Sequence, residues 1–340
     1  MTNEIREILN GGIAIPACPL ALDEARKFDA AAQCGLVRYY AEAGAGGLAV
    51  GVHTTQFAIR EPQHDLFATV LRTAAGELDA ADRNRARPMV RVGGVCGRTE
   101  QAVGEARLLR ELGYHAGLLG LGAMRDSSEA ELIAHCRAVA AEIPVFGFYL
   151  QPAVGGCVLP YSFWRRFAEI EDVVAIKIAA FNRYQTLDVI RALAEAGRDD
   201  IALYTGNDDN IVMDLLTPYR FQVGDRHVTR RFVGGLLGHW AVWTRRAVEL
   251  LERCHTLVAA DAGVPLEMLQ LANEVTDCNA VLFDAANDFH GCIPGIHEVL
   301  RRQGLLKSTV CLDPKEVLSP GQAGEIDRLY AAYPHLVESK

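Results

Sequence analysis

Several hallmarks of specialised protein classes are missing from this 340-residue sequence. No apolar run approaches the roughly 18–20 residues that a membrane-spanning helix needs. The first ten residues include Glu4, Arg6 and Glu7 and contain no apolar core, so we expect no signal peptide. A membrane partner is therefore not expected.

Cysteines are present, but without the spacing that a structural or redox role needs. The nine cysteines are an odd number and include no C-x-x-C pair, so neither a zinc ribbon nor a redox dithiol is predicted. Free and mostly buried thiols are typical of a reducing compartment. Together with the N-terminal sequence, this pattern predicts a cytoplasmic location.

Basic residues are outnumbered by acidic ones. The 34 Lys and Arg residues stand against 43 Asp and Glu residues, and the net charge is −9. Because an acidic surface repels a phosphate backbone, we expect no nucleic-acid partner. Hydrophobic residues make up 50% of the chain and charged residues 23%, which is the balance of a globular protein and not of a disordered one.

Short apolar runs rich in β-branched residues recur along the chain. They begin near Gly12, Gly46, Pro88, Ala116, Ile143, Asp172, Ile201 and Arg231. Helical patterns follow them over residues 24–43, 61–75, 99–112, 128–141, 161–169, 183–196, 208–216 and 242–260. Strands that are apolar on both faces and alternate with helices predict a parallel sheet buried between layers.

Eight strand–helix units predict an α/β fold of the (β/α)8 TIM-barrel type, which typically needs about 250 residues. The alternative, an open doubly wound sheet, would have a Gly-x-Gly-x-x-Gly turn after an early strand, and the glycine-rich residues 92–97 lack that spacing. We predict a catalytic barrel domain over residues 1–262. Residues 263–340 form a predicted C-terminal helical region, with helices over 266–287, 296–303 and 321–333.

Lys177 is the first candidate catalytic residue, because it lies inside the apolar sixth strand. Side chains alternate along a strand, so Lys177 shares the predicted barrel interior with Val173 and Ala175. Desolvation lowers the pKa of a buried amine, and a neutral amine is a nucleophile toward a carbonyl carbon. The alternative is a lysine at a strand end that extends to solvent.

Two further candidates follow neighbouring strand ends, where active sites of such barrels lie. Tyr149 ends the fifth strand, and its hydroxyl is a candidate proton carrier; the alternative is an ordinary packed aromatic. Thr54 and Thr55 follow the second strand, and their hydroxyls with nearby amides are candidate donors to a carboxylate. His53 precedes them and is either a polar site residue or a packing residue.

With these residues in order, the chain resembles the dihydrodipicolinate synthase and N-acetylneuraminate lyase superfamily of class I, Schiff-base aldolases. The resemblance rests on residues 51–55 (GVHTT), 149–152 (YLQP), Lys177 and 206–209 (GNDD), and on the 28-residue spacing between Tyr149 and Lys177. It implies that Lys177 forms the Schiff base and that Tyr149 moves protons. It also implies that Thr54 and Thr55 bind the carboxylate of the 2-oxo acid, and that the protein is a homodimer or homotetramer. His53 and Gly206 are further candidate substrate-binding residues.

The chain also departs from the family pattern. The family's second-strand turn usually reads Gly, two hydroxyl residues, Gly and Glu, whereas this chain has His53, Gln56 and Phe57 around its two threonines. The synthases' tyrosine pair is absent from residues 120–124, and their arginine after the fifth strand is absent from residues 153–156. Arg183 or His53 are the residues that could substitute for that arginine.

These observations predict a Schiff-base-forming lyase or aldolase that acts on a pyruvate-derived 2-oxo acid and is not a true dihydrodipicolinate synthase. We expect no metal and no organic cofactor, because the lysine itself supplies the electrophile. Two alternatives remain open at this point. One is a dehydratase of a 2-oxo sugar acid, and the other is a catalytically weak barrel that binds 2-oxo acids.

Overall fold

Parallel strands and helices alternate along the chain in the computed structural model, which describes residues 1–261 and 263–338. The strands of the main sheet are β1 (Ala14–Pro16), β2 (Gly47–Val50), β3 (Val90–Val95), β4 (Ala116–Leu119), β5 (Val145–Leu150), β6 (Val173–Ala179), β7 (Ala202–Thr205) and β10 (Phe232–Leu237). Their order in the sheet is β1-β10-β7-β6-β5-β4-β3-β2. The predicted (β/α)8 barrel is confirmed.

Each of these strands is followed by a helix, as the sequence predicts. In chain order the helices are α2 (Ala30–Glu42), α3 (Phe67–Asp82), α4 (Thr99–Glu111), α5 (Glu129–Ala140), α6 (Tyr161–Phe167), α7 (Arg183–Ala196), α8 (Ile211–Leu216) and α9 (Thr244–Ala260). The C-terminal helices are α10 (Leu266–Leu282), α11 (Cys292–Arg302) and α12 (Gln322–Ala332).

The chain divides into two compact units. The first unit comprises residues Met1–Ile13 and Val90–Gly235, and the second comprises Ala14–Met89 and Leu236–Lys340. The domain boundary predicted at residue 262 lies outside the described residues, as do residues 339–340. That boundary stays a prediction.

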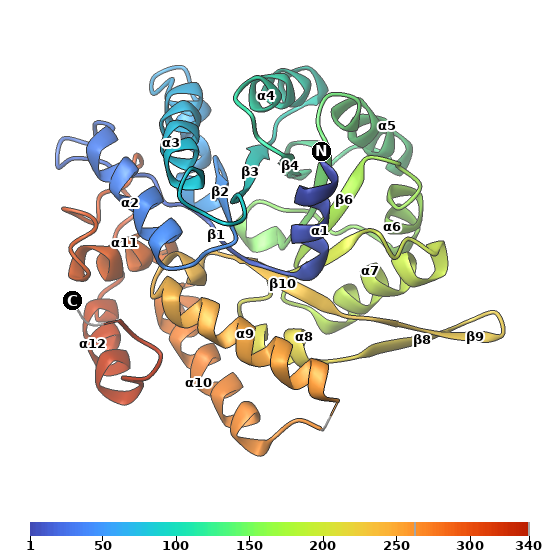
Figure 1. Cartoon of the computed structure of the whole chain (residues 1–340). Helices are drawn as coiled ribbons and strands as arrows, with labels where there is room; N and C mark the ends of the chain where they lie inside the picture. The colour runs from blue at the N-terminus through green and yellow to red at the C-terminus, as the bar shows by residue number, and fades with distance from the viewer. Residues whose placement is uncertain (262, 339–340) are drawn as a thin grey trace. The chain divides into compact units, whose positions relative to one another are not determined.

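In the first unit, strands β3 to β7 pair in parallel and in chain order, with α4 to α7 on their outer side (Figure 1). Every residue of β6 is buried, as an apolar strand between two packed layers requires. Gly147 of β5 allows a close helix contact, because a Cβ there would lie 2.8 Å from Cε1 of Phe167. The interior is therefore tightly packed on both sides of the strands.

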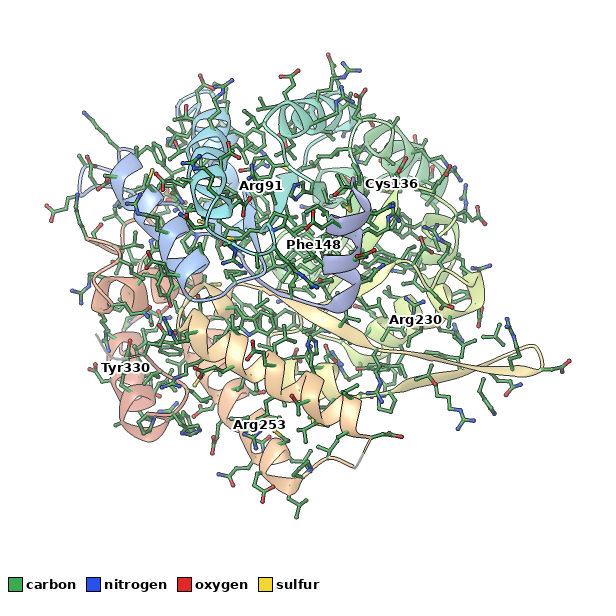
Figure 2. The ribbon with its side chains drawn as sticks, viewed as in Figure 1. Arg91, Cys136, Phe148, Arg230, Arg253 and Tyr330 are labelled. Carbon is green, nitrogen blue, oxygen red and sulfur yellow. The ribbon has the colours of Figure 1, made fainter. Side chains whose placement is uncertain are left out.

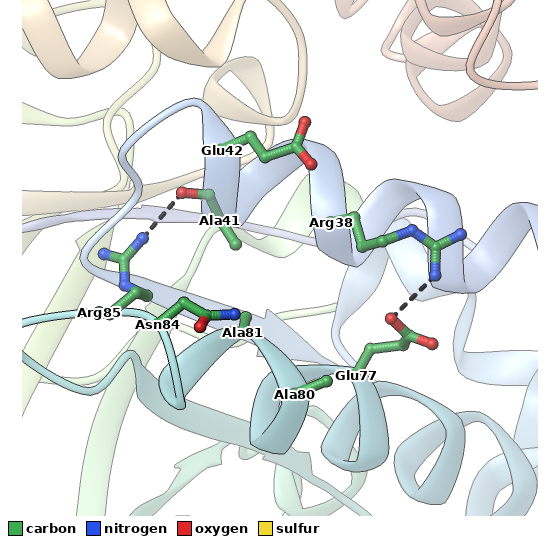
Figure 3. A pocket seen from close by; sticks show the side chains of 8 residues that line it. All are labelled: Arg38, Ala41, Glu42, Glu77, Ala80, Ala81, Asn84 and Arg85. Carbon is green, nitrogen blue, oxygen red and sulfur yellow. Dashed lines mark hydrogen bonds and ion pairs between the residues drawn. The ribbon is translucent and has the colours of Figure 1, made fainter.

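In the second unit, β1 and β2 are joined by a parallel bridge between Ala17 and Ala49. Helices α2 and α3 pack side by side, and a groove of about 310 Å³ lies between them (Figure 3). Three of the charged side chains along this groove have partners within it: Arg38 contacts Glu77 at 2.9 Å, and Arg85 donates to the Ala41 carbonyl at 2.7 Å.

The structure differs from the sequence-based expectations in four places, one of which is α3, found at Phe67–Asp82 where a helix was expected over 61–75. The helix expected over 24–43 begins at Ala30, because Asp29 caps its N-terminus. An additional helix, α1 (Asn3–Gly11), precedes the barrel and buries Ile5, Ile8 and Leu9. An additional hairpin, β8 (Tyr219–Val223) and β9 (Arg226–Arg230), extends from the first unit (Figure 1).

Candidate active site

Lys177 lies within β6 of the first unit and is only 8% exposed. The strand register places it beside Phe148 of β5, which is labelled in Figure 2. The Lys177 Nζ is 4.5 Å from the centre of the Phe148 ring. Burial lowers the pKa of Lys177 to about 8, although the nearby Asp208 carboxylate opposes this shift. The amine is therefore partly neutral near physiological pH, as a nucleophile requires.

The turn after β7 packs directly against this lysine. A Cβ at Gly206 would lie 2.5 Å from Cε of Lys177 and 2.9 Å from Cβ of Ala179, so only glycine fits there. The Gly206 amide donates to the Ile178 carbonyl at 2.7 Å. Gly206, predicted as a substrate-binding residue, is thus in contact with the predicted Schiff-base lysine.

A buried carboxylate, Asp214 of α8, holds the same turn and was missed by sequence reasoning. It is fully buried and accepts hydrogen bonds from the Thr205 hydroxyl at 2.7 Å, the Asn207 amide at 2.9 Å and the Tyr219 hydroxyl at 2.9 Å. The Arg183 guanidinium also donates to it. Thr205, Asn207 and Tyr219 lie within nine residues of Asp214, but the sequence does not show that their side chains turn toward it, and Arg183 lies 31 residues away.

Arg183 is therefore engaged within its own unit. Its Nη1 donates to Asp214, and the pairing raises the pKa of Arg183 despite partial burial. Nη2 of the same guanidinium is buried and has no hydrogen-bond partner among the described residues. The suggestion that Arg183 replaces the synthases' arginine thus has no direct support in the contacts of this residue.

Tyr149 contacts helix α6 and the chain just before it. Its ring lies 5.4 Å from the ring of Trp164, and its hydroxyl accepts a hydrogen bond from the Leu159 amide at 3.2 Å. The register pairs Tyr149 with Ile178, one position beyond Lys177. Among the residues of β5, it is Phe148 that contacts the Lys177 ammonium. The role of Tyr149 stays a prediction.

The loops after β4 and β5 pack against each other. A Cβ at Gly122 would lie 2.0 Å from the Gly155 carbonyl oxygen. The Cys157 thiol points at the Leu121 carbonyl at 3.9 Å. The two stretches that lack the synthases' tyrosine and arginine are therefore held together by backbone contacts.

The turn after β2 belongs to the second unit and is fixed by its two threonines. The Thr54 hydroxyl donates to the Ala17 carbonyl at 2.8 Å, and the Thr55 hydroxyl donates to the Cys18 carbonyl at 2.7 Å. The Thr55 oxygen also accepts from the amides of Gly51 and Val52. Because a hydroxyl has one proton, both threonine side chains already use theirs on carbonyls of the chain after β1.

His53, a candidate from the sequence, differs in its surroundings from a second histidine of the same unit, His239. His53 is half-buried, and its ring lies 5.9 Å from the Phe57 ring. His239, after β10, is 8% exposed and lies 6.0 Å from the Trp243 ring. Burial lowers the pKa of His239 to about 4, although Asn279 opposes the shift, so it is neutral at pH 7.

The described part of the chain comprises residues 1–261 and 263–338. No three His, Cys, Asp or Glu side chains there lie close enough together to hold a metal ion. No helix in the same residues has the length and apolar character needed to span a membrane.

Comparison with known proteins identifies the family of this chain. The sequence model of the dihydrodipicolinate synthetase family matches residues 11–220. A search of curated proteins finds no match. Among solved structures, dihydrodipicolinate synthase from Oceanobacillus iheyensis has a TM-score of 0.75 at 15% identity, covering 97% of this chain and 99% of that one. N-acetylneuraminate lyase from Fusobacterium nucleatum has a TM-score of 0.73 at 15% identity, covering 97% and 100%.

A third solved structure, dihydrodipicolinate synthase from Aquifex aeolicus, has a TM-score of 0.75 at 17% identity and covers 96% of this chain and 100% of that one. At such identities the structural likeness concerns the fold alone. The family match rests on the sequence.

Proposed function

Because this chain belongs to the dihydrodipicolinate synthetase family, whose superfamily consists of class I aldolase-type lyases, we propose that it is a lyase that forms a Schiff base with a pyruvate-derived 2-oxo acid. The observation that carries the proposal is the burial of Lys177 in β6, which lowers its pKa to about 8. An exposed lysine would remain protonated near neutral pH.

In the proposed reaction, Nζ of Lys177 attacks the ketone carbon of the 2-oxo acid. The carbinolamine that forms loses water and becomes an iminium, which accepts the electron pair of the bond that breaks next. Cleavage of a carbon–carbon bond releases an aldehyde and leaves an enamine. Protonation of the enamine and hydrolysis of the imine then return pyruvate and the free amine.

Proton transfer in these steps needs a donor and an acceptor. Tyr149 is the proposed carrier. Its hydroxyl oxygen accepts a hydrogen bond from the Leu159 amide, so the phenol proton remains available for transfer. Asp208 is a second candidate, because its charge acts on Lys177 and it is only 8% exposed. For the carboxylate of the 2-oxo acid, the family resemblance favours the turn of Thr54 and Thr55, with His53 and Gly206 as further binding residues.

The second substrate is proposed to differ from that of the synthases. Residues 120–124 contain no tyrosine and residues 153–156 no arginine. The close approach of Gly122 to the Gly155 carbonyl leaves no room there for a larger side chain. The alternative reading is a dehydratase of a 2-oxo sugar acid, in which the enamine expels water in place of an aldehyde. A homodimer or homotetramer and a cytoplasmic location stay predictions.

Borohydride trapping with pyruvate tests the proposal. Reduction of the imine should add the mass of the reduced pyruvate adduct to a peptide containing Lys177. A barrel that binds 2-oxo acids without forming an imine would remain unmodified. A screen of 4-hydroxy-2-oxo acids for pyruvate release, beside a coupled dehydration assay, then separates aldolase from dehydratase.

A further inference from the structure

Two residues of the second unit adopt backbone conformations that favour glycine. Arg26, in the loop between β1 and α2, has φ of 59°. Gln56, in the turn after β2, has φ of 64° and ψ of 114°. Residues other than glycine rarely adopt such backbone conformations, which persist only where surrounding contacts hold them.

Both residues contact the same peptide group in the C-terminal part of the chain. Oε1 of Gln56 accepts a hydrogen bond from the Leu312 amide at 2.6 Å, and the Arg26 guanidinium donates to the Cys311 carbonyl. The carbonyl of residue 311 and the amide of residue 312 belong to one planar peptide unit. That unit therefore joins the loop after β1 to the turn after β2.

The contact reaches the threonines through short steps. Gln56 is only 4% exposed and directly follows Thr55. The backbone amide of Gln56 donates to the His53 carbonyl at 2.9 Å, and the Thr55 hydroxyl oxygen accepts from the backbone amides of Gly51 and Val52. A change in the backbone at Gln56 would therefore displace Thr55 and its hydrogen bonds.

We propose that Gln56 is a positioning residue, and that the Cys311–Leu312 peptide holds the turn of Thr54 and Thr55 in its binding conformation. The consequence for ligand binding rests on the proposed function, in which this turn receives the carboxylate of the 2-oxo acid. The Cys311–Leu312 peptide is thereby a positioning element of the turn.

Two variants of Gln56 distinguish this positioning role from simple packing. Methionine at position 56 keeps the side-chain length and the unfavourable backbone conformation but cannot accept a hydrogen bond from Leu312. Glycine loses the same hydrogen bond but adopts the conformation without strain. Gln56→Met should therefore disturb the turn, whereas Gln56→Gly should not. If the side chain only filled space, glycine would be the worse substitution.

The first measurement is hydrogen exchange of the Gly51 and Val52 amides, which needs no activity. We expect exchange at least tenfold faster in Gln56→Met and Arg26→Met, and within threefold of the natural protein in Gln56→Gly. Adding Arg26→Met to Gln56→Gly should cause no further change. Lys307→Met, which breaks the exposed ion pair with Asp29 in the same segment, is the matched control and should leave exchange unchanged.

The second measurement is borohydride trapping as a function of pyruvate concentration. In Gln56→Met and Arg26→Met, the half-saturating concentration should rise at least tenfold while the limiting rate stays within threefold. In Gln56→Gly, both the half-saturating concentration and the limiting rate should stay within threefold of those of the natural protein. If Gln56→Met does not fold, the test rests on Arg26→Met. This substitution is then compared in the natural protein and in the Gln56→Gly variant.

Two results would overturn the proposal: Gln56→Gly as impaired as Gln56→Met, or both methionine variants indistinguishable from the natural protein. If pyruvate is not trapped in any protein, the proposed function fails. The exchange measurements then still decide whether the peptide holds the turn.

Discussion

Lys177 lies beside Phe148 on the neighbouring strand, with its ammonium nitrogen 4.5 Å from the centre of the aromatic ring. The ring face attracts a cation, but it offers no hydrogen-bond acceptor to replace lost water. Burial therefore prevails and lowers the pKa of the amine to about 8. The pairing of lysine with phenylalanine is thus suited to a nucleophile and poorly suited to a permanent ion pair.

Replacement of Lys177 should abolish turnover and leave the fold intact. Covalent catalysis has no substitute once the amine is removed, and the surrounding strand is apolar enough to accept alanine. Steady-state rates of Lys177→Ala with the best substrate of the product screen measure this, with circular dichroism as the check of folding. Lys177→Arg is the matched control, since it keeps the charge but forms no imine. A turnover number near the natural one in either variant would contradict the Schiff-base mechanism.

The trapping rate should depend on pH through the lysine. Only the neutral amine attacks the ketone, so the rate should rise with pH and level off above about pH 8. The Asp208 carboxylate raises the pKa of Lys177 against the effect of burial. Asp208→Asn should therefore shift the midpoint of the profile to lower pH, and a midpoint that rises would contradict this assignment.

The same pKa shift has a consequence for stability. The unfolded chain keeps its lysine proton up to about pH 10.5, whereas the folded chain loses it near pH 8. Between these values the unfolded state binds more protons, so the free energy of unfolding should rise with pH. Denaturant titrations of the natural protein and Lys177→Met, compared at pH 8 and pH 10, measure the difference.

Tyr149→Phe tests whether the phenol moves protons. If it does, the turnover number should fall by on the order of 10²–10⁴, the usual contribution of a positioned acid–base group. The variant also loses the bond from the Leu159 amide, so its melting temperature should be measured beside its rate. A rate within a few-fold of the natural one would identify Tyr149 as structural, with Asp208 the remaining candidate.

Thr55→Val should lower both stability and affinity for pyruvate. The Thr55 hydroxyl makes three hydrogen bonds, to the Cys18 carbonyl and from the Gly51 and Val52 amides. If the substrate carboxylate replaces the Cys18 carbonyl as the acceptor of the Thr55 proton, loss of that charge-assisted hydrogen bond would cost about 1.5–3 kcal/mol, or roughly tenfold or more in affinity.

An uncharged ketone analogue is the control for that variant, because it lacks the carboxylate. Its binding should be affected much less than that of pyruvate. Equal weakening of both ligands would show that the carboxylate is bound elsewhere and that Thr55 acts only on the turn.

The alternation of apolar strands and helices was enough to predict the barrel. The burial of Lys177 could be predicted too, since an apolar strand surrounds it on both sides. The hairpin of β8 and β9 carried a readable signal, the alternation over residues 219–223 before a Gly-Asp turn, but it interrupts the barrel's period and so was not predicted.

The finer contacts of the candidate site could not be predicted in the same way. The neighbour of Lys177 depends on the register between β5 and β6, which shifts near Val145, and a shift of one residue exchanges Tyr149 for Phe148. The bonds from Arg183 to Asp214 and from Leu312 to Gln56 join residues that are far apart in sequence. Spacing within one segment carries no information about such partners.

The protein should have little dihydrodipicolinate synthase activity. Condensation with aspartate semialdehyde needs a cation for that substrate's carboxylate, and residues 153–156 supply none. Arg183, the nearest substitute along the chain, is bound to the buried Asp214. Residues 120–124 contain no tyrosine, and at Gly122 the Gly155 carbonyl leaves no room for a side chain.

Positioning and proton transfer act in the same step of that condensation, so the two losses should compound. Pyruvate and aspartate semialdehyde, coupled to the following reductase and run beside a genuine synthase, provide the measurement. We expect kcat/KM more than tenfold below the control. A value within tenfold would mean that other residues hold the semialdehyde, and Arg183→Met would then show whether its guanidinium leaves Asp214 to do so.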